Sequence, residues 1–114
     1  MLHGHYSDVK ADDVDSYGSR KVKMRWLMGP MNGSPNFAMR VLTIEPGGFV
    51  GMHQHPNEHE VFILRGKCHI KTETEEVHLK DGDFILIPEN CGDHSFINEG
   101  DDVLEFICCI PNPS

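Results

Sequence analysis

The 114-residue sequence predicts an all-β protein built as a small antiparallel barrel or sandwich. Short apolar or alternating segments run along the chain, and turn-forming Gly, Pro, Asn and Asp residues interrupt them roughly every eight to twelve residues. No segment of adequate length repeats its apolar residues with a helical period. A chain of this length can form one domain with one core.

The chain divides into two expected parts. Residues 1–20 are polar, with Asp at four positions and little periodicity, and we expect them to form an irregular N-terminal arm. Residues 21–114 are expected to form a single barrel domain.

The first strands are expected at residues 22–28 and 37–44, because both segments place β-branched and other apolar residues between turn signals. A turn that begins at Gly29-Pro30 separates them. Pro46-Gly47-Gly48 should end the second strand, so the histidines that follow are expected on a separate strand.

Two continuous apolar runs, Val61–Leu64 and Phe84–Ile87, each end at a turn-forming Gly or Pro. Such runs are typical of strands that are buried on both faces. Outward-facing side chains such as Phe62 and Leu64 would then pack against a second sheet of the barrel or against another subunit.

Alternation of apolar and polar residues between these two runs predicts a hairpin that turns at Glu73-Thr74. The expected cross-strand pairs are Cys68 with Leu79, His69 with His78, Ile70 with Val77, and Lys71 with Glu76. This register places His69 and His78 on the polar outer face, where we expect solvated side chains.

The last strands are expected at residues 94–97 and 103–110, with a turn between them. In the final strand, Glu105 should face away from the barrel interior. The side chains of opposite parity should face the interior; they are Leu104, Phe106, Cys108 and Ile110.

Charge and hydropathy limit the partners. The formal net charge of -8 leaves no basic face for nucleic acid and no polybasic patch for a membrane surface. No apolar run has the length of a membrane span, and the opening Met1–His5 lacks the features of a signal peptide. We therefore expect a soluble, cytoplasmic protein that binds a small molecule.

The four cysteines are expected to be reduced. Cys108 and Cys109 are adjacent, no CxxC motif occurs, and no secretory signal accompanies them. Cys68 and Cys109 are interpreted as small buried apolar residues.

The strongest functional signal is a group of histidines. His53, His55 and His59 fall within seven residues, and His94 follows later in the chain. Side chains at positions i and i+2 of a strand point the same way, so the rings of His53 and His55 can converge on one point. Because imidazole suits transition metals, this pattern predicts a metal site inside a β structure.

Alternation allows only one of two neighbours to join these rings. If His59 faces the interior, Glu60 faces the opposite side of the strand, and the reverse also holds. A carboxylate is an ordinary metal ligand, so Glu60 is the alternative to His59 on this reasoning alone.

Two motifs in this chain resemble those of the cupin superfamily. Gly47, His53, His55 and Gly66 match the first motif, and Gly82, Pro88, His94 and Asn98 match the second. Asn90 departs from the pattern, because it stands where Gly is usual, and one extra residue separates Pro88 from His94. The resemblance covers about residues 37 to 110.

The resemblance implies a double-stranded β-helix, or jelly-roll, barrel with one divalent transition metal per subunit, which could be Mn, Fe, Ni, Cu or Zn. Counting back from Gly66 places His59 where most cupins have Glu. The implied ligands are therefore His53, His55, His59 and His94, as in small single-domain cupins with four-histidine sites. Neutral ligands leave the full charge on the ion, which favours bound anions.

Two further side chains lie near the expected site. Small four-histidine cupins resemble this chain in having a cysteine at the position of Cys108, which is therefore a candidate catalytic residue as well as a possible core filler. For Arg40, which could orient an anionic substrate, we expect an outer salt bridge instead.

Three functions are compatible with these features. The first is a metal-dependent dioxygenase or other oxidoreductase that acts on a small enol-like or phenolic molecule. The second is a metal-dependent isomerase or lyase without redox change, and the third is a non-catalytic binding or sensor protein, since a fold alone selects none of them. Exposed strand edges lead us to expect a homodimer.

Overall fold

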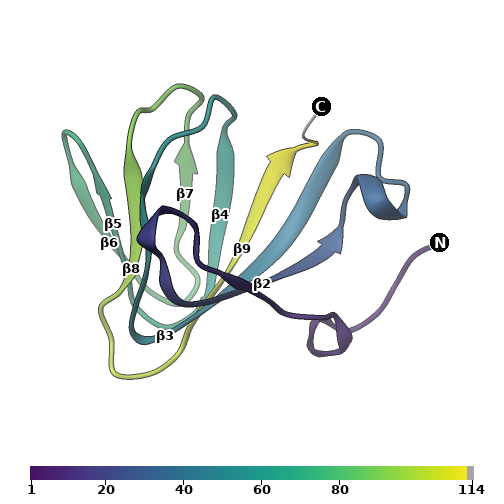
Figure 1. Cartoon of the computed structure of the whole chain (residues 1–114), viewed down its shortest axis with the longest axis horizontal. Coiled ribbons are helices and arrows are strands. Elements are labelled where there is room, and N and C mark those ends of the chain that lie inside the picture. The colour runs from purple at the N-terminus through teal and green to yellow at the C-terminus, as the bar shows by residue number, and fades with distance from the viewer. Residues whose placement is uncertain (113–114) are drawn as a thin grey trace.

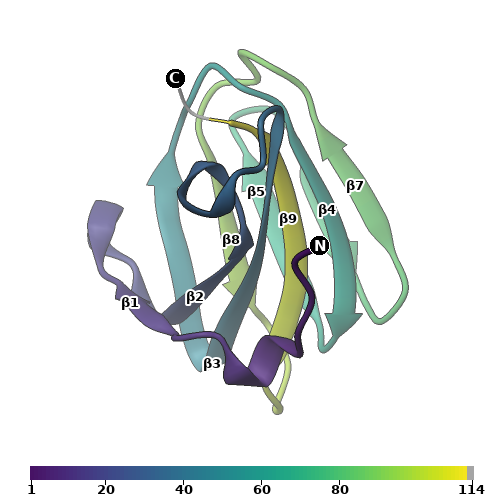
Figure 2. The same ribbon diagram turned by 90° about the vertical axis from the view of Figure 1, so that its right-hand side faces the viewer.

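The computed structural model describes residues 1–112, in which nine β-strands pair antiparallel and curl into a nearly closed barrel (Figures 1 and 2). The strands are β1 (Asp12–Val14), β2 (Arg20–Met28), β3 (Phe37–His53), β4 (His59–Arg65), β5 (Cys68–Thr72), β6 (Glu76–Leu79), β7 (Phe84–Ile87), β8 (His94–Asn98) and β9 (Leu104–Pro111). Three short 3₁₀ turns are η1 (Tyr6–Asp8), η2 (Ser16–Gly18) and η3 (Pro30–Asn32). The all-β prediction is confirmed. Within residues 1–112, no helix has the length and hydropathy that crossing a membrane requires.

The long strand β3 joins the two walls of the barrel. Its first half pairs with β2 on one side and β9 on the other, whereas its last residues pair with β8. The separate strands expected before and after Pro46-Gly47-Gly48 are therefore one strand that changes its partner near these residues. The Pro and Gly signal marks the change of partner and not the end of the strand.

The predicted hairpin is confirmed with the expected register, in which β5 and β6 pair Cys68 with Leu79 and His69 with His78. Cys68 and Ile70 are buried in the core, whereas Lys71 on the same strand is exposed. The period-2 alternation was informative here because one face of this hairpin is buried and the other faces outward.

The barrel interior is filled by aliphatic and aromatic side chains. Phe96 of β8 and Phe106 of β9 stack with ring centroids 5.1 Å apart, which closes the middle of the barrel. The expected parity of β9 is confirmed, because Leu104, Phe106 and Cys108 are all buried in this core. Burial raises the pKa of the Cys68 thiol to about 12, so this cysteine is an uncharged core residue at neutral pH. All four cysteines are free.

Burial of β4 and β7 on both faces was a wrong expectation. Phe62 is 44% exposed and Phe84 is 77% exposed, and Leu64 and Leu86 are exposed as well. Strand β7 is the last strand at its side of the sheet, and the outer face that it shares with β4 stays open in the single chain (Figure 2). A continuous apolar run indicates that both faces of a strand can be buried, but it does not identify the segment or subunit that would cover each face. The homodimer expected from the sequence stays a prediction.

The N-terminal arm is more ordered than expected. Residues 12–14 form β1, which pairs with β2. With three residues, β1 is too short to produce a detectable period in the sequence. Upstream, the hydroxyl of Tyr6 donates a hydrogen bond of 3.1 Å to Glu105, whose carboxylate also accepts from Thr43 and Arg65. Glu105 faces away from the barrel interior, as expected, but the arm covers it, and only 4% of it is exposed.

The arm is held against the barrel at a glycine. A Cβ added at Gly51 would lie 1.8 Å from the carbonyl oxygen of Tyr17, and the amide of Gly51 donates a hydrogen bond of 3.0 Å to Ser19. Strand β3 and η2 can approach this closely only because Gly51 has no side chain.

We predict that Gly51→Ala lowers the free energy of unfolding by about 1–3 kcal/mol, because the new methyl group must push η2 away from β3. Urea denaturation followed by tryptophan fluorescence measures the change. Gly4→Ala is the matched control, since a Cβ at Gly4 meets nothing within 4 Å. Equal stability of the two variants would show that η2 does not pack against β3 in solution.

Candidate metal centre

Three histidine rings converge at one end of the barrel. His53 is the last residue of β3 and lies directly opposite His94, the first residue of β8, in the antiparallel register. His55 follows two residues after the end of β3. One ligand nitrogen from each ring lies within 4.8 Å of the other two, so these histidines could hold a metal ion.

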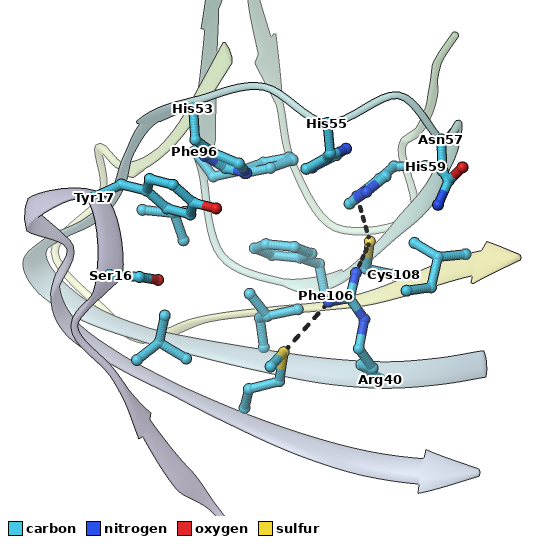
Figure 3. Close-up of a pocket in the computed structure, with 15 residues that line it drawn as sticks. Ser16, Tyr17, Arg40, His53, His55, Asn57, His59, Phe96, Phe106 and Cys108 are labelled. Atoms are coloured by element: carbon cyan, nitrogen blue, oxygen red, sulfur yellow. Dashed lines mark hydrogen bonds between the residues drawn. The ribbon is translucent and has the colours of Figure 1, made fainter. Parts of the chain in front are cut away.

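His59, the first residue of β4, lies beside this group. Its ring stacks on that of His55 with centroids 3.8 Å apart, while its centroid is 6.1 Å from that of His94. Its Nδ1 lies 3.1 Å from the sulfur of Cys108 (Figure 3). The structure therefore brings all four predicted histidines together, with three in mutual ligand distance and the fourth stacked at the side.

Backbone carbonyls orient two of the rings. Nδ1 of His53 donates to the carbonyl of Gly51 at 2.7 Å, and Nδ1 of His94 donates to the carbonyl of Gly92 at 3.1 Å. With the proton on Nδ1, the lone pair of each ring lies on Nε2, which is the atom left to bind a metal.

Several ring nitrogens of this group are buried without a hydrogen bond. They are Nε2 of His94 and both ring nitrogens of His55. A buried nitrogen without a partner costs free energy, and a divalent ion bound to the lone pair of each ring would reduce that cost. The donor set therefore fits a divalent transition metal.

Burial favours the neutral form of His55, His59 and His94. Burial, followed by the charges of His55 and Arg40, lowers the pKa of His59 to about 3. The pKa of His55 is lowered by burial and then by His94 and His53, and burial also lowers the pKa of His94. A neutral imidazole is the form that binds a metal.

Glu60, the alternative ligand, lies elsewhere. Its side chain is exposed on the outer face of β4, where its backbone pairs with Leu86 of β7, and it borders a hollow lined by Phe62 and Phe84. Of the two candidates that alternation left open, the structure turns His59 and not Glu60 toward the other histidines.

A cavity of about 290 Å³ opens beside the histidines (Figure 3). Most of its lining is apolar. The polar side chains that reach it are Ser16, Tyr17, Arg40, His53, His55, Asn57, His59 and Cys108. A small organic molecule in this cavity would contact the histidines at one end and apolar side chains along its length.

Arg40 lies inside the cavity, so the expected outer salt bridge is wrong. Its Nη2 donates to the sulfur of Cys108 at 3.1 Å, and its guanidinium lies over the ring of Trp26. Among residues 1–112 it pairs with no carboxylate, and its Nε is buried without a hydrogen bond. The register of β3 with β9 explains this, because it sets Arg40 opposite Cys108, whose side chain points inward.

The thiol of Cys108 connects Arg40 to His59. Burial raises the pKa of this thiol, and the neighbouring Arg40 acts in the opposite direction. For His59 to bind a metal through Nε2, its proton must sit on Nδ1 and be donated to the sulfur. Cys108 then accepts hydrogen bonds from both neighbours and fixes the orientation of the His59 ring.

Residues 40–110 of the chain match the family model of the cupin domain. The chain belongs to the cupin family. The resemblance inferred from the two motifs is thereby confirmed, and cupin domains commonly bind a divalent metal. A search of curated protein sequences gives no match.

Solved structures agree with this assignment. The polyketide cyclase RemF from Streptomyces resistomycificus is 25% identical and superimposes with a TM-score of 0.90, over 99% of this cupin and 80% of RemF. A predicted oxalate decarboxylase from Thermotoga maritima is 25% identical with a TM-score of 0.80, over 98% and 100% of the two chains. KdgF from Halomonas sp. is 16% identical with a TM-score of 0.73, over 95% and 92%, and this likeness concerns the fold alone.

The loop before His94 contains Asn90, one of the two departures from the cupin motif. Asn90, at the position where Gly is usual, has a φ of 58°. This left-handed conformation favours Gly, but Asn is one of the residues that tolerate it. Asn at this position is therefore compatible with the backbone conformation of the loop.

Sequence reasoning missed Tyr17. This residue of η2 stacks on His53 with ring centroids 4.7 Å apart and an angle of 14° between the planes, and it forms one wall of the cavity (Figure 3). The only signal in the sequence was an aromatic residue followed by Gly within a polar segment. Asn57 and Ser16 were missed as well.

We predict that the metal-free protein loses stability as the pH falls below about 6.5. The unfolded state binds a proton on His59 near pH 6.5, but the folded state does so only near pH 3, so the unfolded state gains protons first. The free energy of unfolding should fall by up to about 1.4 kcal/mol per pH unit for this histidine, with His55 and His94 adding to the slope.

Urea denaturation at several pH values between 7.5 and 4.5, with a chelator present, measures this slope. His59→Gln should make it shallower, whereas His3→Gln should not change it, since His3 is exposed in the arm. Identical slopes for wild type and His59→Gln would contradict a buried neutral ring at this position.

Proposed function

We propose that this cupin is a metal-dependent enzyme that acts on a small enol-like or phenolic molecule with an anionic group. The observation that carries the proposal is that one mostly apolar cavity holds both the neutral ring of His59 with its neighbouring histidines and the half-buried guanidinium of Arg40. Within residues 1–112, the cavity lining supplies no carboxylate to balance this positive charge, so the substrate is expected to supply the negative charge.

His53, His55 and His94 would hold the ion, and His59 would complete a four-histidine set. When bound, a divalent metal supplies a Lewis acid that stabilises an enolate or phenolate oxygen. Imidazole nitrogens suit several of the candidate metals Mn, Fe, Ni, Cu and Zn, so the metal content of the purified protein will identify the ion.

The residues around the ion have separate tasks in this proposal. Arg40 binds the anionic group of the substrate and so sets its orientation. The apolar lining, including Phe96 and Phe106, excludes water and strengthens the interaction between opposite charges. Tyr17 covers one face of His53, and Cys108 holds Arg40 and His59 in place.

Non-redox carbonyl chemistry on an enolisable substrate is the reaction class that we favour. Its support is the likeness to the polyketide cyclase RemF, which extends over 99% of this chain at 25% identity. Ring closure in a polyketide-like molecule needs a stabilised enolate and exclusion of water, which the cavity described above would provide.

An oxygenase or oxidoreductase is the second candidate. It would use the same enolate or phenolate, and the mostly apolar cavity could admit dioxygen beside the substrate. The two candidates differ in whether oxygen is consumed and in whether the metal must be able to change its oxidation state.

We predict that the barrel histidines bind about one divalent transition metal per chain, so that the metal content of wild type should exceed that of His94→Ala by about one ion per chain when plasma mass spectrometry follows purification without a chelator. His94→Ala and His59→Ala should each weaken metal binding at least about tenfold, because each removes a proposed ligand. Glu60→Gln is the control and should bind as tightly as wild type. Tight binding by His59→Ala together with loss in Glu60→Gln would reverse the ligand assignment.

The reaction is tested with a panel of polyketide-like diketones, catechols and flavonols, assayed in air and under argon. Turnover under argon by zinc-loaded protein supports the cyclase-type reaction. Oxygen uptake only with Mn, Fe, Cu or Ni supports the oxygenase, and binding without turnover in either gas supports a binding protein.

Arg40→Met should raise KM for a carboxylate-bearing substrate about 10- to 100-fold, because the variant loses one charge-assisted hydrogen bond to the substrate. The methyl ester of the same substrate should show no such change, and Arg40→Lys should restore part of the affinity. An equal loss with acid and ester would mean that Arg40 supports the cavity without contacting the substrate.

A further inference from the structure

A second group of metal-binding side chains lies on the outside of the barrel. His69 of β5 and His78 of β6 are direct cross-strand partners, and their rings stack with centroids 4.4 Å apart and planes at 16°. Both side chains point to the outer face, because their neighbours Cys68 and Ile70 point into the core. Their placement is independent of the barrel histidines.

Two carboxylates flank this pair. Both oxygens of Glu99 lie 2.9 Å from Nδ1 of His78, and an oxygen of Glu76 lies 3.3 Å from Nε2 of His69. One donor atom each from His69, His78 and Glu99 lies within 4.8 Å of the other two. This is the spacing that a single ion needs from three ligands.

The backbone fixes these side chains from three directions. The antiparallel pairing of β5 with β6 sets the two rings opposite each other. Glu99 follows β8, the neighbour of β5 on its other side, and its amide donates to the carbonyl of Lys67 at 3.2 Å. Figure 1 shows β5, β6 and β8 side by side at one end of the molecule.

The present contacts do not satisfy the group completely. Nε2 of His69 is buried and makes no hydrogen bond, even though the Glu76 carboxylate is near. The side chain of His69 is 20% exposed and that of His78 is 61% exposed, so an ion from solvent can reach the pair. The net charge of -8 also favours the approach of a cation.

We propose that His69, His78 and Glu99 form a second, surface site for a divalent transition metal such as Zn²⁺. Two imidazoles and one carboxylate are an established zinc ligand set, and the fourth position is open to water or to Glu76. The bound ion would link the edge strand β6 to the segment after β8. Because it binds only the folded chain, it would raise the stability of this end of the barrel.

The test is a zinc titration of the full chain by calorimetry, with His3→Gln and His5→Gln in every variant to remove the two histidines of the exposed arm. We expect two zinc ions per chain in the parent. His78→Gln should lose the ion at the surface site, and His94→Gln should lose the ion at the barrel site. One ion in the parent and none in His78→Gln would support the surface site and reject the barrel site. Equal stoichiometry and affinity in parent and His78→Gln would overturn the surface site.

Thermal unfolding in the His94→Gln background provides a second measurement. Zinc should raise the Tm of this protein, and His78→Gln should abolish the shift. Glu99→Gln should weaken zinc binding at least about tenfold. Lys71→Gln, an exposed position two residues from His69 on the same strand, is the matched control and should change nothing. A zinc-induced shift that survives His78→Gln and Glu99→Gln would also overturn the proposal.

Discussion

The antiparallel pairing between the end of β3 and the start of β8 is the interaction on which the candidate site depends. It sets His53 opposite His94 at one mouth of the barrel, and the carbonyls of Gly51 and Gly92 then fix the tautomer of both rings. A shift of this register by one residue would turn one of the two rings to the other face of the sheet. The change of partner along β3 matters for the same reason, because it lets a single strand carry both Arg40 and His53.

Charge explains how the rest of the cavity is arranged. A divalent ion at the histidines and the guanidinium of Arg40 would together place three positive charges around a mostly apolar space. Burying so much charge without a counter-charge is costly. Two features reduce this cost: the pKa values of His55, His59 and His94 are lowered, which favours their neutral forms, and Arg40 lies over Trp26. In the proposed function, a bound anion would supply the remaining balance. On the function proposed above, the cavity would favour a negatively charged ligand over a neutral one.

The sequence predicted those parts of the molecule that local spacing controls. The β5–β6 register, the inward parity of Cys108 and the meeting of four histidines all follow from period-2 alternation and from two motifs. It failed where the outcome depends on partners distant in the chain. Phe84 is as apolar as a core residue, but nothing local says that its face stays open, and Arg40 turns inward only because β9 lies beside it. The contact between Tyr17 and His53 depends on how a polar arm folds back, which has no period to detect.

One wall of the cavity is formed by the N-terminal segment of the chain. The family match begins at residue 40, whereas Val14, Ser16 and Tyr17, which line the cavity, precede it. The histidines of the candidate metal site thus belong to the barrel, whereas Val14, Ser16 and Tyr17 belong to the N-terminal segment that packs over it. Substitutions in the first twenty residues could therefore change the shape of this wall without changing the histidines of the barrel.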